Sequence, residues 1–400
     1  MPLTLLLDLD DTLLDTHMDA FIPAYFDALS RAMADHVDPA IMLPALMGGT
    51  KRMFANENPS LWLRDVFDGY FFDKLRINKE SLQSEIDKFY DEVFTSLASL
   101  TNPIPEAVEL VEWAFLQGYR IVIATNPLFP KKAIHHRMRW AGLPPEKYPF
   151  SLITSYENMH FTKSPAYYSE ILGCLGWPED PVVMVGDNID MDLIPARVVG
   201  IPVFHISASG DVDSNFIPDG RGRISELRPW LEQSDRSNWT LKFNTSESLL
   251  SVLRSTPASL ADLADGIPYD QWMRCPESDE WSLNEIFCHL RDVELEVNIP
   301  RIQTLLGETN PFIAGQITDD WVHQRDYDRQ DGREALLIMA KARTQLVALL
   351  ANLSPEDWKR SARHSVFGPT HLQELVSFIA SHDRSHIQQV LATICEVVTS

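Results

Sequence analysis

The chain has 400 residues, too many for one ordinary domain, and its composition, 45% hydrophobic and 23% charged, is typical of folded, core-forming protein. Its formal net charge of −23 disfavours binding to nucleic acid or anionic membranes, and no apolar run approaches the length that crosses a bilayer. Four scattered cysteines and a start without a basic segment argue against a disulfide framework and a signal peptide, so we expect a cytoplasmic protein that acts on a small molecule.

The first half of the chain alternates short apolar runs with helical patterns. Thr4–Leu9 is an apolar run ending in carboxylates, which predicts a buried parallel strand. Residues from about 17 to 100 follow a helical period, with Phe21, Tyr25 and Leu29 on one face. The patterns then predict strands and helices in alternation: strands Ile121–Ala124, Ser151–Thr154, Val182–Val185 and Pro202–Ile206, and helices Lys131–Trp140 and Ala166–Leu175. This alternation indicates a parallel α/β sheet into which the helical block is inserted.

The second half lacks this alternation. A polar stretch at 236–245 predicts a linker, and no convincing strand follows it. We expect helices near 246–264, 283–306, 332–351 and 371–397, two of which begin with capping-box patterns (Ser282 with Glu285, Thr370 with Gln373). Pro300 should kink or end the second of these helices. The chain is therefore expected to combine an α/β part with an all-α helical bundle.

Two carboxylates, Asp8 and Asp10, follow the first predicted strand directly, at the edge where ligands of open α/β sheets bind. Hydrolysis of a phosphate ester through a covalent intermediate needs two such groups. One attacks phosphorus, and the other protonates the leaving oxygen and then deprotonates water. Because both face a phosphate dianion, cations must offset the repulsion, and Mg²⁺ with carboxylate ligands is suited to this.

Matching polar residues follow the later strands. Thr125 and Asn126 can donate hydrogen bonds to phosphoryl oxygens, and Lys163 can neutralise developing charge. After Val185, the loop with Asp187 and Asp192 offers carboxylates to a metal ion.

With these motifs in this order, residues 1–235 resemble the haloacid dehalogenase superfamily, which implies a Rossmann-like parallel sheet. The resemblance makes Asp8 the nucleophile that forms an aspartyl-phosphate and Asp10 the general acid and base. It also implies that Thr125 and Lys163 bind phosphate, and that Mg²⁺ is held by Asp8, the backbone carbonyl of Asp10, and Asp187. Asp192 would support Lys163. Members that displace halide need no acid at position 10, so Asp10 favours phosphoryl transfer.

The helical insertion at about 16–104 resembles the α-helical cap that closes over such sites and selects the substrate. Its aromatic residues predict either an ordinary cap core or a hydrophobic substrate pocket. Gly48–Arg52 is expected to be a solvated turn or a mobile basic loop, and Gly220–Arg223 a flexible loop.

In the second half, His382 and His386 lie four residues apart on a predicted helix, so their rings project from one face. They can chelate a transition metal if a third ligand comes from elsewhere, and His289 is the candidate. His323, His364 and His371 lack partner spacing and are expected to be surface or capping residues.

The segments around His289 and from His382 to Gln388 make residues 246–400 resemble a DinB-like four-helix bundle. That resemblance implies a three-histidine metal site at His289, His382 and His386, for which Zn²⁺ or Ni²⁺ is suitable. Asp383 and Glu285 are candidates for groups that orient these ligands.

Together these patterns predict a Mg²⁺-dependent phosphatase that acts on a small phosphorylated metabolite. Three alternatives remain open: a phosphomutase, a metal-dependent thiol transferase whose chemistry lies in the bundle, and a ligand-binding or regulatory protein. The sequence also leaves open whether the bundle forms a homodimer.

Overall fold

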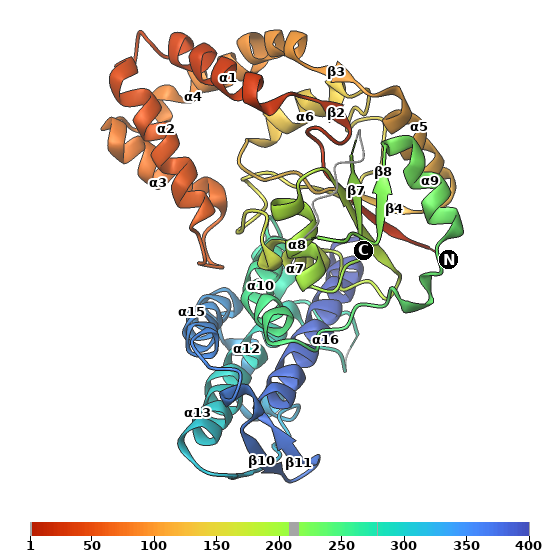
Figure 1. The fold of residues 1–400 in the computed structure, drawn as a ribbon. Helices are drawn as coiled ribbons and strands as arrows, with labels where there is room; N and C mark the ends of the chain where they lie inside the picture. Colours follow the sequence, from red (N-terminus) through yellow and green to blue (C-terminus); the bar gives the residue numbers. More distant parts are fainter. Residues whose placement is uncertain (1, 208–215, 278, 400) are drawn as a thin grey trace. The chain divides into compact units, whose positions relative to one another are not determined.

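The computed structural model describes residues 2–207, 216–277 and 279–399 (Figure 1). These residues form two compact units. The first contains the described residues up to Glu57, Leu61–Tyr167 and Pro178–Leu241, and the second contains Asn58–Ser60, Tyr168–Trp177 and those from Lys242 onward. In the described parts, no helix has the length and apolar character needed to span a membrane. All four cysteines are free.

The first unit is built on a six-stranded parallel sheet with the order β5–β4–β1–β6–β7–β8. Its strands are β1 (Thr4–Leu7), β4 (Arg120–Ile123), β5 (Leu152–Ile153), β6 (Val182–Gly186), β7 (Val203–Ile206) and β8 (Gly220–Gly222). The register pairs Leu7 with both Ile123 and Val185. The carboxyl ends of the three central strands therefore lie level, which brings the residues that follow each strand to one edge.

Both faces of this sheet are buried, because alternate residues of each strand point to opposite sides. Leu5 and Leu7 belong to the main core with residues of α5 (Pro105–Leu116) and α9 (Ile224–Gln233). Leu6, on the opposite face, is also fully buried. The remaining helices between these strands are α6 (Lys131–Trp140), α7 (Pro165–Cys174), η3 (Ile189–Leu193) and α8 (Ile194–Val198), and η4 (Arg236–Asn238) follows α9.

A helical block lies between β1 and β4 in the chain. It contains α1 (Met18–Ala32), α2 (Pro39–Phe54), α3 (Leu63–Leu75), α4 (Lys79–Lys88), η1 (Phe89–Val93) and η2 (Phe94–Leu100). The segments that enter and leave it pair as the short antiparallel strands β2 (Leu14–Asp15) and β3 (Asn102–Pro103). Phe21, Tyr25 and Leu29 are buried on one face of α1, which confirms the predicted pattern.

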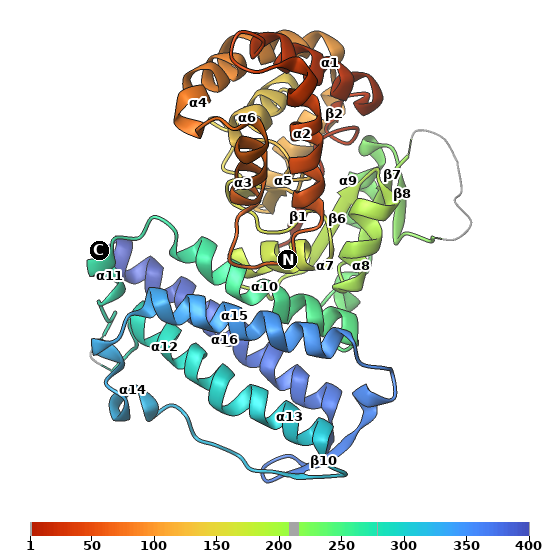
Figure 2. The same ribbon diagram turned by 90° about the vertical axis from the view of Figure 1, so that its left-hand side faces the viewer.

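The second unit is a bundle of long helices that lie side by side in Figure 2. The bundle helices are α10 (Ser246–Ala264), α12 (Leu283–Val293) continued by η5 (Glu294–Asn298) and α13 (Ile299–Gly307), α15 (Gly332–Ala351) and α16 (Leu372–Thr399). Short elements join them: α11 (Tyr269–Trp272), β9 (Phe312–Ile313), α14 (Trp321–Gln324), η6 (Tyr327–Arg329), η7 (Asp357–Lys359), β10 (Ser361–His364) and β11 (Gly368–His371). The predicted combination of an α/β fold and an all-α bundle is confirmed.

Several local predictions for the second unit are tested by this fold. The capping box of Ser282 with Glu285 is present, since the Ser282 hydroxyl accepts from the Glu285 N–H and the Glu285 carboxylate accepts from the Ser282 N–H. The capping box of Thr370 with Gln373 is wrong, because Thr370 lies in β11 and its hydroxyl donates to Glu374 instead. Pro300 does not end its helix: it lies in the first turn of α13, which follows the π-helical segment η5 and runs on to Gly307.

The expectation of no strand in the second half is also wrong. Strands β9, β10 and β11 form a small sheet, in which β10 and β11 are antiparallel. Pro369 within β11 hid the pattern, because proline is uncommon inside strands and is tolerated at a sheet edge.

Two predicted loops are regular elements. Gly48–Arg52 lies within α2, where a Cβ at Gly48 would come 2.3 Å from the Tyr70 ring, so the glycine allows α2 and α3 to approach. Gly220–Gly222 is strand β8, where a Cβ at Gly220 would come 2.5 Å from Trp230. In both cases the glycine serves close packing rather than flexibility.

Candidate active site and metal centre

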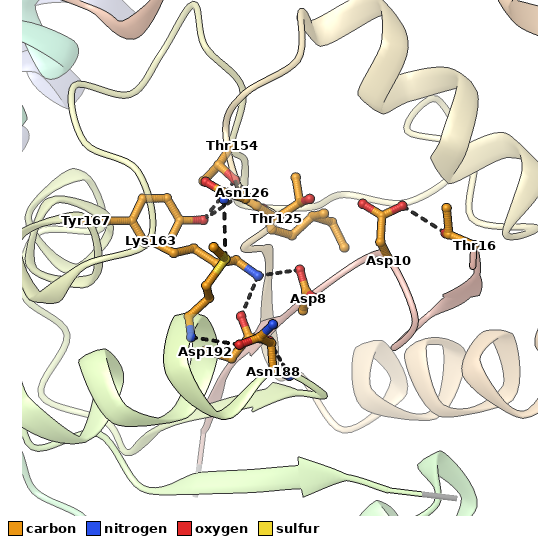
Figure 3. Close-up of polar contacts among 12 residues, drawn as sticks. Asp8, Asp10, Thr16, Thr125, Asn126, Thr154, Lys163, Tyr167, Asn188 and Asp192 are labelled. Carbon is orange, nitrogen blue, oxygen red and sulfur yellow. Dashed lines mark hydrogen bonds and ion pairs between the residues drawn. The ribbon is translucent and has the colours of Figure 1, made fainter. Parts of the chain in front are cut away.

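Asp8 lies at the carboxyl edge of the sheet, immediately after β1. Its backbone N–H donates to the carbonyl of Val185 at 2.9 Å, which extends the pairing of β1 with β6 by one residue. The side chain is almost fully buried. Asp8 is therefore held rigidly beside the loop that follows β6, as Figure 3 shows.

Lys163 joins two carboxylates from different segments, Asp8 after β1 and Asp192 in η3. Its Nζ donates to Asp8 Oδ1 at 2.6 Å and also to Asp192 Oδ1. Burial alone would lower the pKa of Lys163, but the charges of Asp192 and Asp8 outweigh it and raise the pKa above its ordinary value. Lys163 therefore stays protonated.

Three carboxylates surround this one cation. Oxygen atoms of Asp8, Asp187 and Asp192 lie within 4.8 Å of one another. Burial and the charge of Asp192 raise the pKa of Asp8 to about 7, and burial and the charge of Asp8 raise the pKa of Asp187 to about 7. A Cβ at Gly186 would come 2.3 Å from Asp192, so only glycine lets this carboxylate come so close to the strand end.

Thr125 and Asn126 follow β4 and reach the same edge (Figure 3). The Thr125 carbonyl accepts from the hydroxyls of Thr154 and Tyr167, both at 2.8 Å, which fixes this loop. The Asn126 Nδ2 donates to the sulfur of Met191 at 3.7 Å, and its buried Oδ1 has no partner among the described residues.

Asp10 lies apart from the acidic cluster. The Thr16 hydroxyl donates to Asp10 Oδ1 at 2.9 Å, and Arg137 Nη1 pairs with Asp10 Oδ2 at 2.5 Å. Arg137 is 1% exposed and lies over the ring of Phe129. Both carboxylate oxygens of Asp10 are thus engaged in this conformation.

A cavity of about 360 Å³ lies in the helical block, bounded on one side by Leu128–Pro130, which follow Asn126 closely. Most of its walls are apolar, and the Asp68–Lys79 ion pair lies at its lining. Tyr25 and Phe67 are among the aromatic residues that line it. Tyr25 belongs to the main core and Phe67 packs against it, so the prediction of a cap core is confirmed, and both side chains also face this hollow.

In the second unit, the three predicted histidines meet. His289 comes from α12, and His382 and His386 come from α16. The Nε2 of His382 lies 3.4 Å from that of His289 and 3.1 Å from that of His386. Three imidazole nitrogens that face one another at such distances can surround a single ion.

These imidazoles are poised to be neutral. Burial and the neighbouring ring charges lower the pKa of His289 to about 3, and burial lowers the pKa of His382 and of His386 to about 4. His386 Nδ1 donates to Gln389 Oε1 at 2.8 Å, so its Nε2 is free to bind a metal.

A buried ionic network lies behind the histidines. The Arg343 guanidinium pairs with both carboxylate oxygens of Glu294, at 2.7 and 2.9 Å, and with Asp383. The Thr256 hydroxyl also donates to Asp383. Asp383 thus supports the helix that carries His382, whereas Glu285, the other predicted supporting group, is committed to the capping box.

Comparison with protein families follows this division of the chain. Residues 3–200 match the haloacid dehalogenase-like hydrolases, and residues 253–390 match the DinB superfamily. The two matches fall on different parts of the chain. Its first unit is thus a haloacid dehalogenase-like (HAD-like) hydrolase, and its helical bundle is DinB-like.

Individual relatives are distant. A protein of Oceanobacillus iheyensis named "Putative metal-dependent hydrolase OB0782" is 26% identical over 113 residues, which are 28% of this chain and 64% of that protein. The HAD phosphatase from Thermococcus onnurineus is 23% identical, with 58% of this chain and 98% of that one covered and a TM-score of 0.37. YfiT from Bacillus subtilis, a four-helix bundle, is 20% identical, with 40% and 91% covered and a TM-score of 0.35.

Sequence reasoning missed Arg137 in the HAD-like unit and Arg343 and Glu294 in the DinB-like bundle. A signal was present for each arginine. Arg137 shares a buried face of α6 with Ala133 and Ile134, and Arg343 shares one of α15 with buried apolar residues. An arginine within an apolar stripe indicates a buried acidic partner, because an unpaired buried charge is too costly.

His364 was also misjudged. It is buried, and its Nδ1 accepts from the backbone N–H of Val366 at 3.2 Å. His371 does cap a helix, because its Nδ1 accepts from the N–H of Glu374.

Proposed function

We propose that the HAD-like unit is a Mg²⁺-dependent phosphatase that hydrolyses a small phosphorylated metabolite through an aspartyl-phosphate at Asp8. One observation carries this proposal: among the described residues, the cluster of Asp8, Asp187 and Asp192 contains one cation, Lys163.

The charges of this cluster favour a divalent ion. With all three carboxylates ionised, their charge exceeds that of Lys163 by two. Burial first, and the neighbouring carboxylate second, raise the pKa values of Asp8 and Asp187. Oxygen-rich acidic sites suit Mg²⁺, for which Asp8, Asp187 and the carbonyl of Asp10 are the proposed ligands. The ion would offset the repulsion between Asp8 and a phosphate dianion.

Different residues of this chain then carry out the successive steps of the reaction. An oxygen of Asp8 forms a bond to phosphorus as the bond to the leaving oxygen breaks, and Asp10 gives that oxygen its proton. Asp10 next takes a proton from the water that attacks the aspartyl-phosphate, which restores Asp8 and releases inorganic phosphate. Thr125, Asn126 and Lys163 hold the phosphoryl oxygens.

The structure sets one condition on Asp10. Because its carboxylate is held by Thr16 and Arg137, it must exchange at least one of these partners for the leaving group. Its presence nonetheless favours phosphate esters over haloacids, since halide departs without a proton.

The apolar cavity beside Leu128–Pro130 favours a substrate whose leaving group is partly hydrophobic. Substrates with an aromatic or alkyl group should therefore be cleaved better than sugar phosphates.

The test is phosphate release from a phosphoester panel that includes aryl, alkyl and sugar esters, with Mg²⁺ or with a chelator. We expect Mg²⁺-dependent turnover that Asp8→Asn abolishes and that Asp190→Asn, a change of an exposed carboxylate of η3, leaves intact. Halide release from 2-haloacids in place of phosphate release would replace the phosphatase by a dehalogenase. Absence of any Mg²⁺-dependent turnover would refute the proposal.

We further propose that the DinB-like bundle binds Zn²⁺ or Ni²⁺ at His289, His382 and His386. The convergence of three Nε2 atoms, each from a neutral imidazole, supports this. Three protein ligands leave coordination positions for water or substrate, as in metal-dependent hydrolases and thiol transferases. Metal analysis of the purified protein should show an ion that His382→Ala removes, and equal metal content in both proteins would exclude the site.

A further inference from the structure

A cavity of about 530 Å³ lies next to the histidine cluster in the bundle, and the functions proposed above do not use it. It lies between the α12–η5–α13 helix and α16, with His382 among its lining residues. The loop at Gly315–Thr318 and the turn between β10 and β11 complete it.

The walls of this cavity are mainly aliphatic and aromatic. Val297, Leu375 and Ile379 line its interior. At its rim, Ile317 and Val366 are 80% and 72% exposed, and Phe367 is 52% exposed. Large apolar side chains that gather at the mouth of an apolar hollow are typical of a site that receives an apolar ligand.

One cation faces this apolar space. Arg301 is half-buried, and among the described residues it forms no ion pair with a carboxylate. Its Nη2 donates to the carbonyl of Ala314 at 2.9 Å, which orients the guanidinium. Burial lowers the pKa of Arg301, and no acidic group counters that effect. An uncompensated guanidinium in a partly apolar site favours an anionic partner.

His364 adds a second donor at the same end. Its Nδ1 accepts backbone N–H bonds from Val366 and Phe367, so the neutral ring carries its proton on Nε2. Burial lowers the pKa of His364, and the nearby charge of Arg301 lowers it further. The two side chains are thus close, and both offer N–H groups.

Arg301 and the histidine cluster lie at opposite ends of the cavity. Val293, Val297 and Arg301 all line the cavity, and His289 lies four residues before Val293 on α12. A rise of about 1.5 Å per residue separates His289 from Arg301 by roughly 18 Å. On α16, Leu375, Ile379 and His382 line the cavity, and the chain there runs toward the histidine cluster.

We propose that this cavity binds an elongated apolar carboxylate, whose charged group is held by Arg301 and His364 and whose chain extends toward the three-histidine cluster. The planar guanidinium matches the two oxygens of a carboxylate, and the apolar walls remove the chain from water. Binding at the Arg301 end needs no metal ion, so it is independent of both functions proposed above.

Calorimetry on the full-length protein tests this with three probes of equal chain length: decanoate, decanol and decylammonium. We expect decanoate to bind at least tenfold more tightly than decanol, and decylammonium to bind least, in metal-free and metal-loaded protein alike. Equal affinities for the anion and the cation would overturn the proposal, as would the absence of decanoate binding.

Arg301→Gln localises the anionic end. It should weaken decanoate binding at least tenfold and leave decanol binding unchanged. The matched control is Arg274→Gln, which removes an exposed arginine of the same unit that already pairs with Asp270. Unchanged decanoate affinity in Arg301→Gln would show that the carboxylate is held elsewhere and would refute the assignment; if this variant fails to fold, the three-probe comparison on the wild type decides alone.

Discussion

The acidic cluster of the HAD-like unit and the histidine cluster of the DinB-like bundle are two different electrostatic solutions for holding a metal ion. At the sheet edge, Asp8, Asp187 and Asp192 carry excess negative charge around Lys163. In the bundle, the three histidines carry no charge at neutral pH, because burial lowers their pKa values.

This difference follows from the surroundings of each cluster. At the sheet edge, Lys163 pairs with Asp8 and Asp192 and so stabilises their charge despite burial, whereas the histidine rings contact one another and burial favours their neutral form. The charged groups of the bundle lie behind the histidines, where Arg343 forms ion pairs with Glu294 and Asp383. We therefore expect the metal affinity of the acidic cluster to depend on the charge of the cation. The metal affinity of the histidine cluster should depend on how strongly the cation prefers nitrogen ligands.

The largest expected effects are the loss of phosphoester turnover without loss of metal from the histidine cluster, and the converse. Asp8→Asn should reduce phosphoester turnover by a factor on the order of 10³ or more, because an amide cannot form the covalent intermediate. It should leave the metal content of the histidine cluster unchanged, and His382→Ala should do the reverse. Phosphate release and metal analysis on both variants measure this; a variant that loses both properties while folded would break the comparison.

The ionic network behind the histidines gives the next largest effect. Arg343→Met leaves Glu294 and Asp383 buried without their cation, which should lower the free energy of unfolding by about 3–5 kcal/mol. Urea denaturation followed by fluorescence measures it. The exposed pair of Arg274 with Asp270 provides the contrast, since Arg274→Gln should change stability by less than about 0.5 kcal/mol. A similar small change in both variants would show that the network does not stabilise the bundle.

Acid should separate the two clusters by their metal affinity. Asp8 and Asp187, with pKa values raised to about 7, bind protons as the pH falls below 7, so Mg²⁺ must displace them. Its affinity should fall about tenfold per pH unit for each proton displaced. The histidines stay neutral until about pH 4, so Zn²⁺ affinity should change little between pH 7 and 5.5. Titration calorimetry at these two pH values measures both affinities, and parallel losses would contradict the assigned charge states.

The smallest expected effect concerns Gln389, whose Oε1 accepts from His386 Nδ1. Gln389→Leu removes this acceptor and frees the imidazole to rotate or change tautomer, so Zn²⁺ affinity should fall about tenfold. Gln388→Leu, at the neighbouring position, is the control. Competition with a chromogenic chelator compares the two variants, and equal affinities would remove Gln389 from the site.

Much of the fold could be predicted from periodicity. Helices Lys131–Trp140, Ser246–Ala264 and Gly332–Ala351 have the predicted bounds, because each has a regular apolar face and clear end signals. The strands β8 to β11 were missed, since each has only two to four residues and a glycine or proline lies in β8 and β11. Segments this short depend on their neighbours rather than on their own pattern.

The candidate sites show the same limit. Asp8, Lys163 and Asp187 could be named because each lies at a strand end or in a nearby loop, and parallel strands bring such residues to one edge. The attachment of Asp10 to Arg137 joins residues 127 positions apart, and no local pattern encodes that pairing.

By itself, the sequence determined the two kinds of architecture and the residues able to act, because side-chain chemistry and hydrophobic period are local properties. Only the tertiary structure decided where the charges lie: Asp10 with Arg137, Asp383 with Arg343, and Arg301 at an apolar hollow. The physical reason is that charge pairing and burial depend on distance in space, which packing sets over the whole unit.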